Sequence, residues 1–205
     1  MKNLEEIVQR KIMSHKKKSW IIIFLAVILN SMFFSSSLAS DRQGTFELII
    51  GNYSMSEPRF KAVYQKGGLI EGFSLSIFII RDVDFYFEMR GFYKSGELTY
   101  TKERTHFLLI PVSLGIQYNR SFGLFCPYLG LGIDYYFYAE TNPIRTIINY
   151  TRGIHFQGGS YFKISEKSPV WLDLKLKYTS AKTEENNLEI QLGGFEFGLG
   201  LVLVF

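Results

Sequence analysis

The clearest pattern in the chain is an alternation of residue types at its C-terminal end. Large apolar side chains occupy every second position, at Phe195, Phe197, Leu199, Leu201, Leu203 and Phe205, with Glu196, Gly198 and Gly200 between them. A period of two places the apolar set on one face of a β-strand. Such a strand aggregates when its edge and apolar face meet water. The pattern therefore predicts one strand of a closed barrel that faces lipid on the outside.

Seven further segments of the chain show the same alternation, so eight strands are predicted in all. They cover residues 45–53, 68–80, 85–94, 105–119, 127–140, 152–164, 172–178 and 195–205. Abundant Tyr, Phe and Gly support strands over helices. A change of phase at Gly193-Gly194 predicts a β-bulge ahead of the last strand. The fold class is all-β, an eight-stranded antiparallel up-and-down barrel.

The lengths of the links between these strands alternate. Long, mostly polar links follow the first, third, fifth and seventh strands, at 54–67, 95–104, 141–151 and 179–187, and the other links are short. Transmembrane barrels have short turns on the periplasmic side and longer loops outside. An even strand number then places both chain ends in the periplasm.

The N-terminal segment has the features of a secretory signal peptide. Lys16-Lys17-Lys18 precedes an apolar run at 20–29, and Ser37 and Ala39 are the small residues of a cleavage site after Ala39. A retained membrane anchor is the alternative, but the apolar run is shorter than the ~20 residues a spanning helix needs. We therefore expect residues 1–39 to be removed and residues 40–205 to form the barrel domain. The start codon is left open between Met1 and Met13.

The net charge and the cysteine content restrict the partners and the covalent links that the chain can have. The chain carries a formal charge of +4, and the six basic and two acidic residues of segment 1–39 account for all of it. The remaining domain is neutral, so nothing in it favours a nucleic-acid partner. Cys126 is the single cysteine, which excludes an intramolecular disulfide.

The order of the segments resembles the small eight-stranded outer-membrane barrels of the OmpX, OmpA and OmpW type, and the broader porin-family group of barrel domains. The resemblance rests on residues 110–118, residues 127–133 and the terminal Phe205 with its alternating apolar set. It implies residence in the outer membrane of a Gram-negative cell envelope. It also implies recognition of Phe197, Leu199, Leu201, Leu203 and Phe205 by the barrel-assembly machinery. Leu203 stands where such families often carry an aromatic residue.

Alternation alone fits a lipocalin-like soluble carrier as well, with the apolar face inside. Aromatic residues near the strand ends and the terminal Phe205 favour the membrane barrel, in which the polar face lines the interior. The predicted interior cluster is Glu47, Glu88, Arg90, Asp134, Lys163, Asp173, Lys175, Lys177 and Glu196. Eight strands enclose just enough space for side chains. These charges are therefore expected to form ion pairs and to leave no large pore.

No residue pattern predicts an enzyme, a metal site or a cofactor. After the leader the histidines are His106 and His155, and neither is followed two residues later by Ser, as it is in the deacylase barrels. His155 is expected to form hydrogen bonds in the interior. No Cys/His cluster has metal-ligand spacing.

Two functions remain open from the sequence. In the first, a monomeric barrel is a structural or surface-interaction protein, adhesion-like, whose outer loops meet envelope or host surface molecules. In the second, it is a narrow conduit or binder for a small hydrophobic molecule, at a site lined by Tyr136, Tyr138, Tyr161 and Trp171.

Overall fold

The computed structural model describes residues 43–64, 67–80, 82–165, 168–185 and 188–205, and the predicted signal peptide and its cleavage site lie outside them. The elements are β1 (Gly44–Met55), α2 (Pro58–Tyr64), β2 (Gly68–Ile80), β3 (Val83–Glu97), β4 (Arg104–Asn119), β5 (Phe125–Thr141), β6 (Thr146–Lys163), β7 (Val170–Glu185), β8 (Leu188–Gln191) and β9 (Gly194–Val204). Within this part of the chain, no helix has the length and apolar character needed to cross a membrane.

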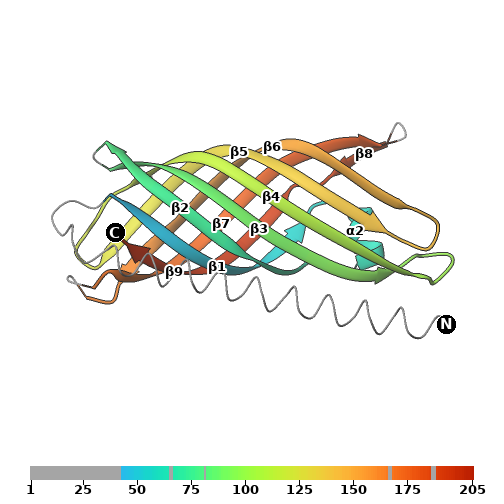
Figure 1. Ribbon diagram of the computed structural model, residues 1–205, viewed down its shortest axis with the longest axis horizontal. Coiled ribbons are helices and arrows are strands. Elements are labelled where there is room, and N and C mark those ends of the chain that lie inside the picture. The colour runs from blue at the N-terminus through green and yellow to red at the C-terminus, as the bar shows by residue number, and fades with distance from the viewer. Residues whose placement is uncertain (1–42, 65–66, 81, 166–167, 186–187) are drawn as a thin grey trace, which may run out of the picture. The chain divides into compact units, whose positions relative to one another are not determined.

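The strands form a closed antiparallel barrel, as predicted (Figure 1). Each strand from β1 to β7 pairs with the next, and β9 closes the ring by pairing with both β7 and β1. At the closure, the backbone N–H groups of Gln43 and Gly44 donate to the Phe205 carbonyl, and the Phe205 N–H donates to Gly44. Because the strands of the barrel wall are paired on both sides, the backbone polar groups of the wall are satisfied within it, and only the β5–β6 and β7–β8 hairpins at the loop end keep free edges.

The two ends of the barrel differ in their connections. The turn end carries the links β2–β3, β4–β5 and β6–β7 together with residue 205, and the loop end carries α2 and the links β3–β4, β5–β6 and β7–β8. Two predicted long links are wrong. The one after the fifth strand is short because β6 begins at Thr146 and pairs there with Thr141, and the one at 179–187 lies mostly in β7, whose last residue Glu185 pairs with Leu188 of β8. Cross-strand contacts such as that between the Phe137 and Tyr150 rings, 6.4 Å apart, extend the β5–β6 hairpin.

At the predicted bulge the pairing is interrupted, since the N–H groups of Leu192 and Gly193 both donate to the Ala181 carbonyl, but the register on either side is the same. Lys182 pairs with Gln191, and three positions further along each strand Thr179 pairs with Gly194, so no residue is inserted. The change of phase has another cause. Leu192 lies on the inward face with the residues of β9, and the interior is apolar at this depth, so an inward position holds a large apolar residue.

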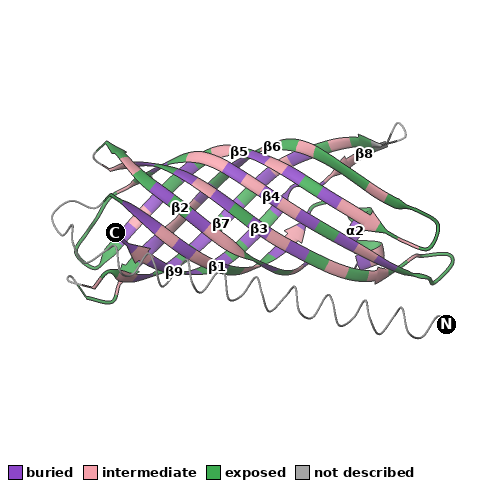
Figure 2. Ribbon diagram, viewed as in Figure 1, coloured by how far each residue is buried: buried purple, intermediate pink, exposed green. Residues whose placement is uncertain are grey.

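The outward face of the barrel is apolar and the inward face is largely polar at mid-barrel. Leu129, Ile154 and Leu201 are more than half exposed, while Glu88 and Asp134 are fully buried. Figure 2 shows the two classes alternating along the strands. A lipocalin-like carrier has the opposite arrangement, so that alternative is wrong. Of the C-terminal set, Phe197, Leu199, Leu201 and Phe205 are exposed on the outer wall and Leu203 is half-buried beside them.

Candidate functional site: the filled barrel interior

The interior of the barrel is filled with side chains in three successive zones. An aromatic and aliphatic cluster lies at the loop end, ionised side chains fill the middle, and a second aromatic cluster lies at the turn end. We call them the upper cluster, the charge layer and the lower cluster.

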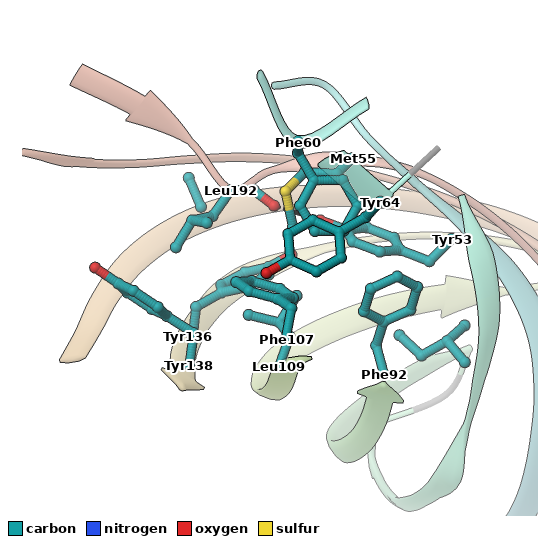
Figure 3. Packing of buried hydrophobic residues seen from close by; sticks show 12 residues of the cluster. Tyr53, Met55, Phe60, Tyr64, Phe92, Phe107, Leu109, Tyr136, Tyr138 and Leu192 are labelled. Atoms are coloured by element: carbon teal, nitrogen blue, oxygen red, sulfur yellow. Dashed lines mark hydrogen bonds between the residues drawn. The ribbon is translucent and has the colours of Figure 1, made fainter. Parts of the chain in front are cut away.

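The upper cluster contains residues from the strands and from α2. Its members are Tyr53, Met55, Phe60, Tyr64, Ile70, Phe92, Phe107, Leu109, Tyr136, Tyr138, Ala181 and Leu192. Figure 3 shows the rings of Phe60 and Tyr64 lying over those of Phe92 and Phe107. The Phe60 ring centroid lies 4.7 Å from that of Tyr64 and 5.1 Å from that of Phe107. α2 therefore covers the mouth of the barrel and buries its own apolar face there.

The position of α2 is fixed by polar contacts at both of its ends. Pro58 stands at the first helical position, where its missing N–H costs nothing. The Glu57 carboxylate accepts hydrogen bonds from the backbone N–H groups of Arg59 at 3.2 Å and Gln191 at 3.0 Å, which ties the helix start to β8. At the other end, the Tyr64 hydroxyl donates to Glu140 at 2.9 Å and lies 2.8 Å from the Thr105 hydroxyl.

Burial also keeps the Tyr64 side chain neutral. Removal from water raises the pKa of the Tyr64 phenol well above its usual value. The hydroxyl is therefore a donor to Glu140 at any physiological pH.

The charge layer is centred on Glu88. One carboxylate oxygen of Glu88 lies 2.9 Å from Lys177 Nζ, and the other lies 2.9 Å from the Arg90 guanidinium and 3.3 Å from Lys175 Nζ. Arg90 also donates to Glu196. Paired and hydrogen-bonded charges of this kind are tolerated away from water, whereas single charges are costly.

Further ion pairs surround Glu88 within the charge layer. Lys175 Nζ lies 2.9 Å from Glu47 and 3.8 Å from Asp173, and Lys177 Nζ lies 3.3 Å from Asp134. The Ser113 hydroxyl accepts from Lys177 at 2.7 Å and bonds Asp134.

His155 joins the charge layer on the Asp134 side. Its Nδ1 lies 2.9 Å from Asp134 Oδ1, and its Nε2 is bonded to the Tyr86 hydroxyl. Its place in the barrel interior is the one expected from the sequence.

Eight of the nine predicted interior charges lie together in this layer, and Lys163 does not. Lys163 is half-buried at the turn end, where its Nζ donates to the Ser121 hydroxyl at 2.6 Å and lies 5.2 Å from the centre of the Trp171 ring. It is the last residue of β6, so it faces inward at the rim instead of in the middle. The sequence reasoning missed Ser113 and Tyr86 as partners, because neither residue type is charged.

The lower cluster fills the turn end of the barrel. It consists of Cys126, Tyr128, Tyr161, Trp171, Val202 and Val204. The Tyr128 hydroxyl donates to Asp173 at 2.8 Å, which joins the cluster to the charge layer. The aromatic residues expected to line one ligand site are therefore divided, since Tyr136 and Tyr138 belong to the upper cluster and Tyr161 and Trp171 to the lower one.

The second histidine lies outside the interior. His106 Nδ1 is near two hydroxyl groups, of Tyr93 at 2.7 Å and Ser95 at 3.1 Å, on the exposed outer surface of the loop end. Among the described residues, no ion pair joins a carboxylate to His106, whereas His155 lies beside Asp134.

Comparison with known proteins gives the fold. No protein-family model and no curated protein matches the sequence. Among solved structures, neisserial surface protein A has a TM-score of 0.61 at 14% identity, over 79% of this chain and 97% of that one. Outer membrane protein W of E. coli has a TM-score of 0.53 at 12% identity, over 82% of this chain and 100% of that one. The N-terminal β-barrel domain of Pseudomonas aeruginosa OprF has a TM-score of 0.51 at 16% identity, over 80% of this chain and 100% of that one. This chain has the fold of the small eight-stranded outer-membrane β-barrels.

Proposed function

We propose that this protein is a monomeric, closed outer-membrane barrel that acts at the cell surface as a structural or interaction protein and performs no catalysis. The observation that carries the proposal is the filling of the interior by the upper cluster, the charge layer and the lower cluster. A solute path along the axis would have to displace α2 and then separate the ion pairs of Glu88. Interaction through the exposed end is therefore favoured over conduction.

The proposed orientation puts the turn end in the periplasm and the loop end outside. The loop end carries α2 and the extended β5–β6 and β7–β8 hairpins, which supports placing it on the side where outer-membrane barrels have their larger loops. The N-terminal leader, removed after Ala39, would deliver the chain to the envelope. The barrel-assembly machinery would then recognise the last strand through Phe197, Leu199, Leu201, Leu203 and Phe205, which form an apolar row on the outer wall.

The loop end offers a surface for a partner. Tyr100 is 97% exposed in the β3–β4 link, and Ile144, Ile148 and Tyr150 are exposed on the β5–β6 hairpin. Exposed apolar side chains held on a paired hairpin are typical of interaction sites. Neisserial surface protein A, named for its surface location, shares the fold.

The surface role is tested with a variant in which Ile144, Ile148 and Tyr150 are all changed to Ser. A strain lacking the gene is complemented with the wild type, this variant, or a control that carries Lys182→Ser on the exposed part of β7. We expect only the triple variant to lose attachment to surfaces or integrity of the envelope, while all three proteins reach the outer membrane. Wild-type behaviour of the triple variant would contradict a role for this surface.

A cavity under α2 supports the second candidate function. It has a volume of about 160 Å³; Phe60, Phe107, Tyr138 and Leu192 give it an apolar part, and Glu57, Arg59 and Glu140 also line it. Apolar cavities of about 150 Å³ bind benzene. We expect benzene to raise the unfolding temperature of the wild type and to have no effect on Leu192→Phe, which fills the cavity. An equal response of both proteins would eliminate this site.

A further inference from the structure

The outer wall of the barrel is hollowed along β6. At this point the row of large outward side chains is interrupted by Gly158 and Ser160, with Phe156 on the loop side and Phe162 on the turn side. We call the depression the wall groove. It has a volume of about 810 Å³, within the range of ~300–1,000 Å³ that is usual for ligand sites.

Small residues and their neighbours shape the wall groove. Gly158 pairs with Leu129 on β5 and Leu176 on β7, and Ser160 pairs with Leu174. A Cβ atom built on Gly158 meets only the flexible end of Leu129, at 3.0 Å, and the Tyr128 carbonyl oxygen, at 3.6 Å. The depression therefore results from missing side chains on β6, between aliphatic side chains of the adjacent strands.

The wall groove rises from the turn end toward mid-barrel. Its paired row begins at Tyr118, the next-to-last residue of β4, and continues through Leu129 and Gly158 to Leu176, in the middle of β7. The groove then reaches Phe195 on β9. Adjacent strands are about 4.8 Å apart, so these four steps span roughly 19 Å. One leaflet of hydrocarbon is roughly 15 Å thick, which matches an oblique path of this length.

A cation lies at the lower end of the wall groove. Arg120 belongs to the β4–β5 turn, is exposed, and places its guanidinium 5.7 Å from the centre of the Phe122 ring. Arg120 and Phe122 both line the groove. Arg at the level where an apolar wall ends is suited to bidentate contact with a phosphate group.

We propose that the wall groove binds one phospholipid of the leaflet on the turn side, with an acyl chain over Gly158 and Ser160 and its phosphate on Arg120. The shape of the groove fits an acyl chain, its course fits a molecule anchored at the turn end, and Arg120 is placed to bind the phosphate. The inference rests on the proposed insertion of the barrel in a membrane, and it does not depend on the surface role.

The test measures retained lipid by native mass spectrometry of the full-length barrel released from detergent containing palmitoyl-oleoyl phosphatidylglycerol. Four variants are compared with the wild type. Gly158→Leu fills the groove, and Gly91→Leu places the same side chain on the outside of β3, where a Cβ meets only Glu71 O at 3.9 Å. Arg120→Gln removes the cation, and Arg152→Gln removes an exposed arginine from the loop side of β6. Mobility on unheated gels shows separately that each barrel has folded.

We expect the wild type, Gly91→Leu and Arg152→Gln to retain one phosphatidylglycerol. Gly158→Leu should reduce the bound fraction about tenfold, and Arg120→Gln should reduce it similarly. Equal lipid binding by Gly158→Leu and Gly91→Leu, both folded, would overturn the proposal. A second protein copy in place of lipid at the groove, lost in Gly158→Leu, would overturn it too.

Discussion

At the scale of single residues, Glu88 is the acid that holds the charge layer together. It contacts Arg90, Lys175 and Lys177, and its side chain is fully buried. Removing its charge leaves three buried cations with fewer acids, and breaking a buried ion pair from one side is far more costly than removing the pair.

Glu88→Gln is therefore expected to lower the free energy of unfolding by about 3–5 kcal/mol. Urea unfolding in phospholipid vesicles, followed by Trp171 fluorescence, gives this value. The control is Glu189→Gln, which removes an ion pair to Lys182 of 2.7 Å at an exposed site, where such pairs contribute ~0–1 kcal/mol. Similar losses for the two variants would show that the charge layer is solvated.

Two adjacent glycines test the assignment of inside and outside. A Cβ on Gly159 would collide with the Tyr128 ring and the Leu174 backbone, whereas a Cβ on Gly158 faces the lipid side. Gly159→Leu should cost about 1–3 kcal/mol or prevent folding, because it overfills the interior. Gly158→Leu should fold normally. The opposite order, measured by the same urea titration, would mean that the faces of β6 are reversed.

At the scale of elements, α2 closes the loop end because its two aromatic side chains complete a cluster that the strands leave open. Seven residues are too few for a stable isolated helix. Its position therefore depends on Phe60 and Tyr64 inside the barrel and on the Glu57 bonds to the backbone.

Phe60→Ala should loosen α2 without unfolding the barrel. Losing a buried Phe costs about 3–5 kcal/mol, which corresponds to at least a hundredfold easier opening. A maleimide is applied to Leu109→Cys in a Cys126→Ala background, since Leu109 lies fully buried under the helix. We expect labelling about a hundredfold faster when Phe60→Ala is added. Unchanged labelling would show that α2 does not control access to the interior.

The common register of β8 and β9 against β7 gives another test at this scale. Leu192 faces the upper cluster and Gln191 faces outward, so Leu192→Asp should prevent folding while Gln191→Asp is tolerated. Recovery of folded protein is measured on unheated gels after refolding into detergent. Tolerance of both substitutions would restore the bulge that the alternation predicts.

At the scale of the whole molecule, the sequence predicts the barrel because lipid outside and charge inside impose one period on every strand. The same alternation does not show how deep in the barrel a residue lies. Lys163 and Lys175 both occupy inward positions of their strands, yet Lys163 lies at the rim and Lys175 in the charge layer. Phe92 and Leu109 likewise occupy inward positions that alternation alone marks as polar. α2 has no strand pattern, and only its Pro58 start is visible in the sequence.

The central claim, an assembled membrane barrel with an apolar exterior, is tested most directly by gel mobility of the outer-membrane fraction with and without boiling. The intact chain is compared with one that lacks Phe205, whose backbone bonds to Gln43 and Gly44 close the barrel. We predict a folded species in that fraction that shifts on boiling and is strongly diminished without Phe205. Soluble periplasmic protein that shows no shift would contradict the account.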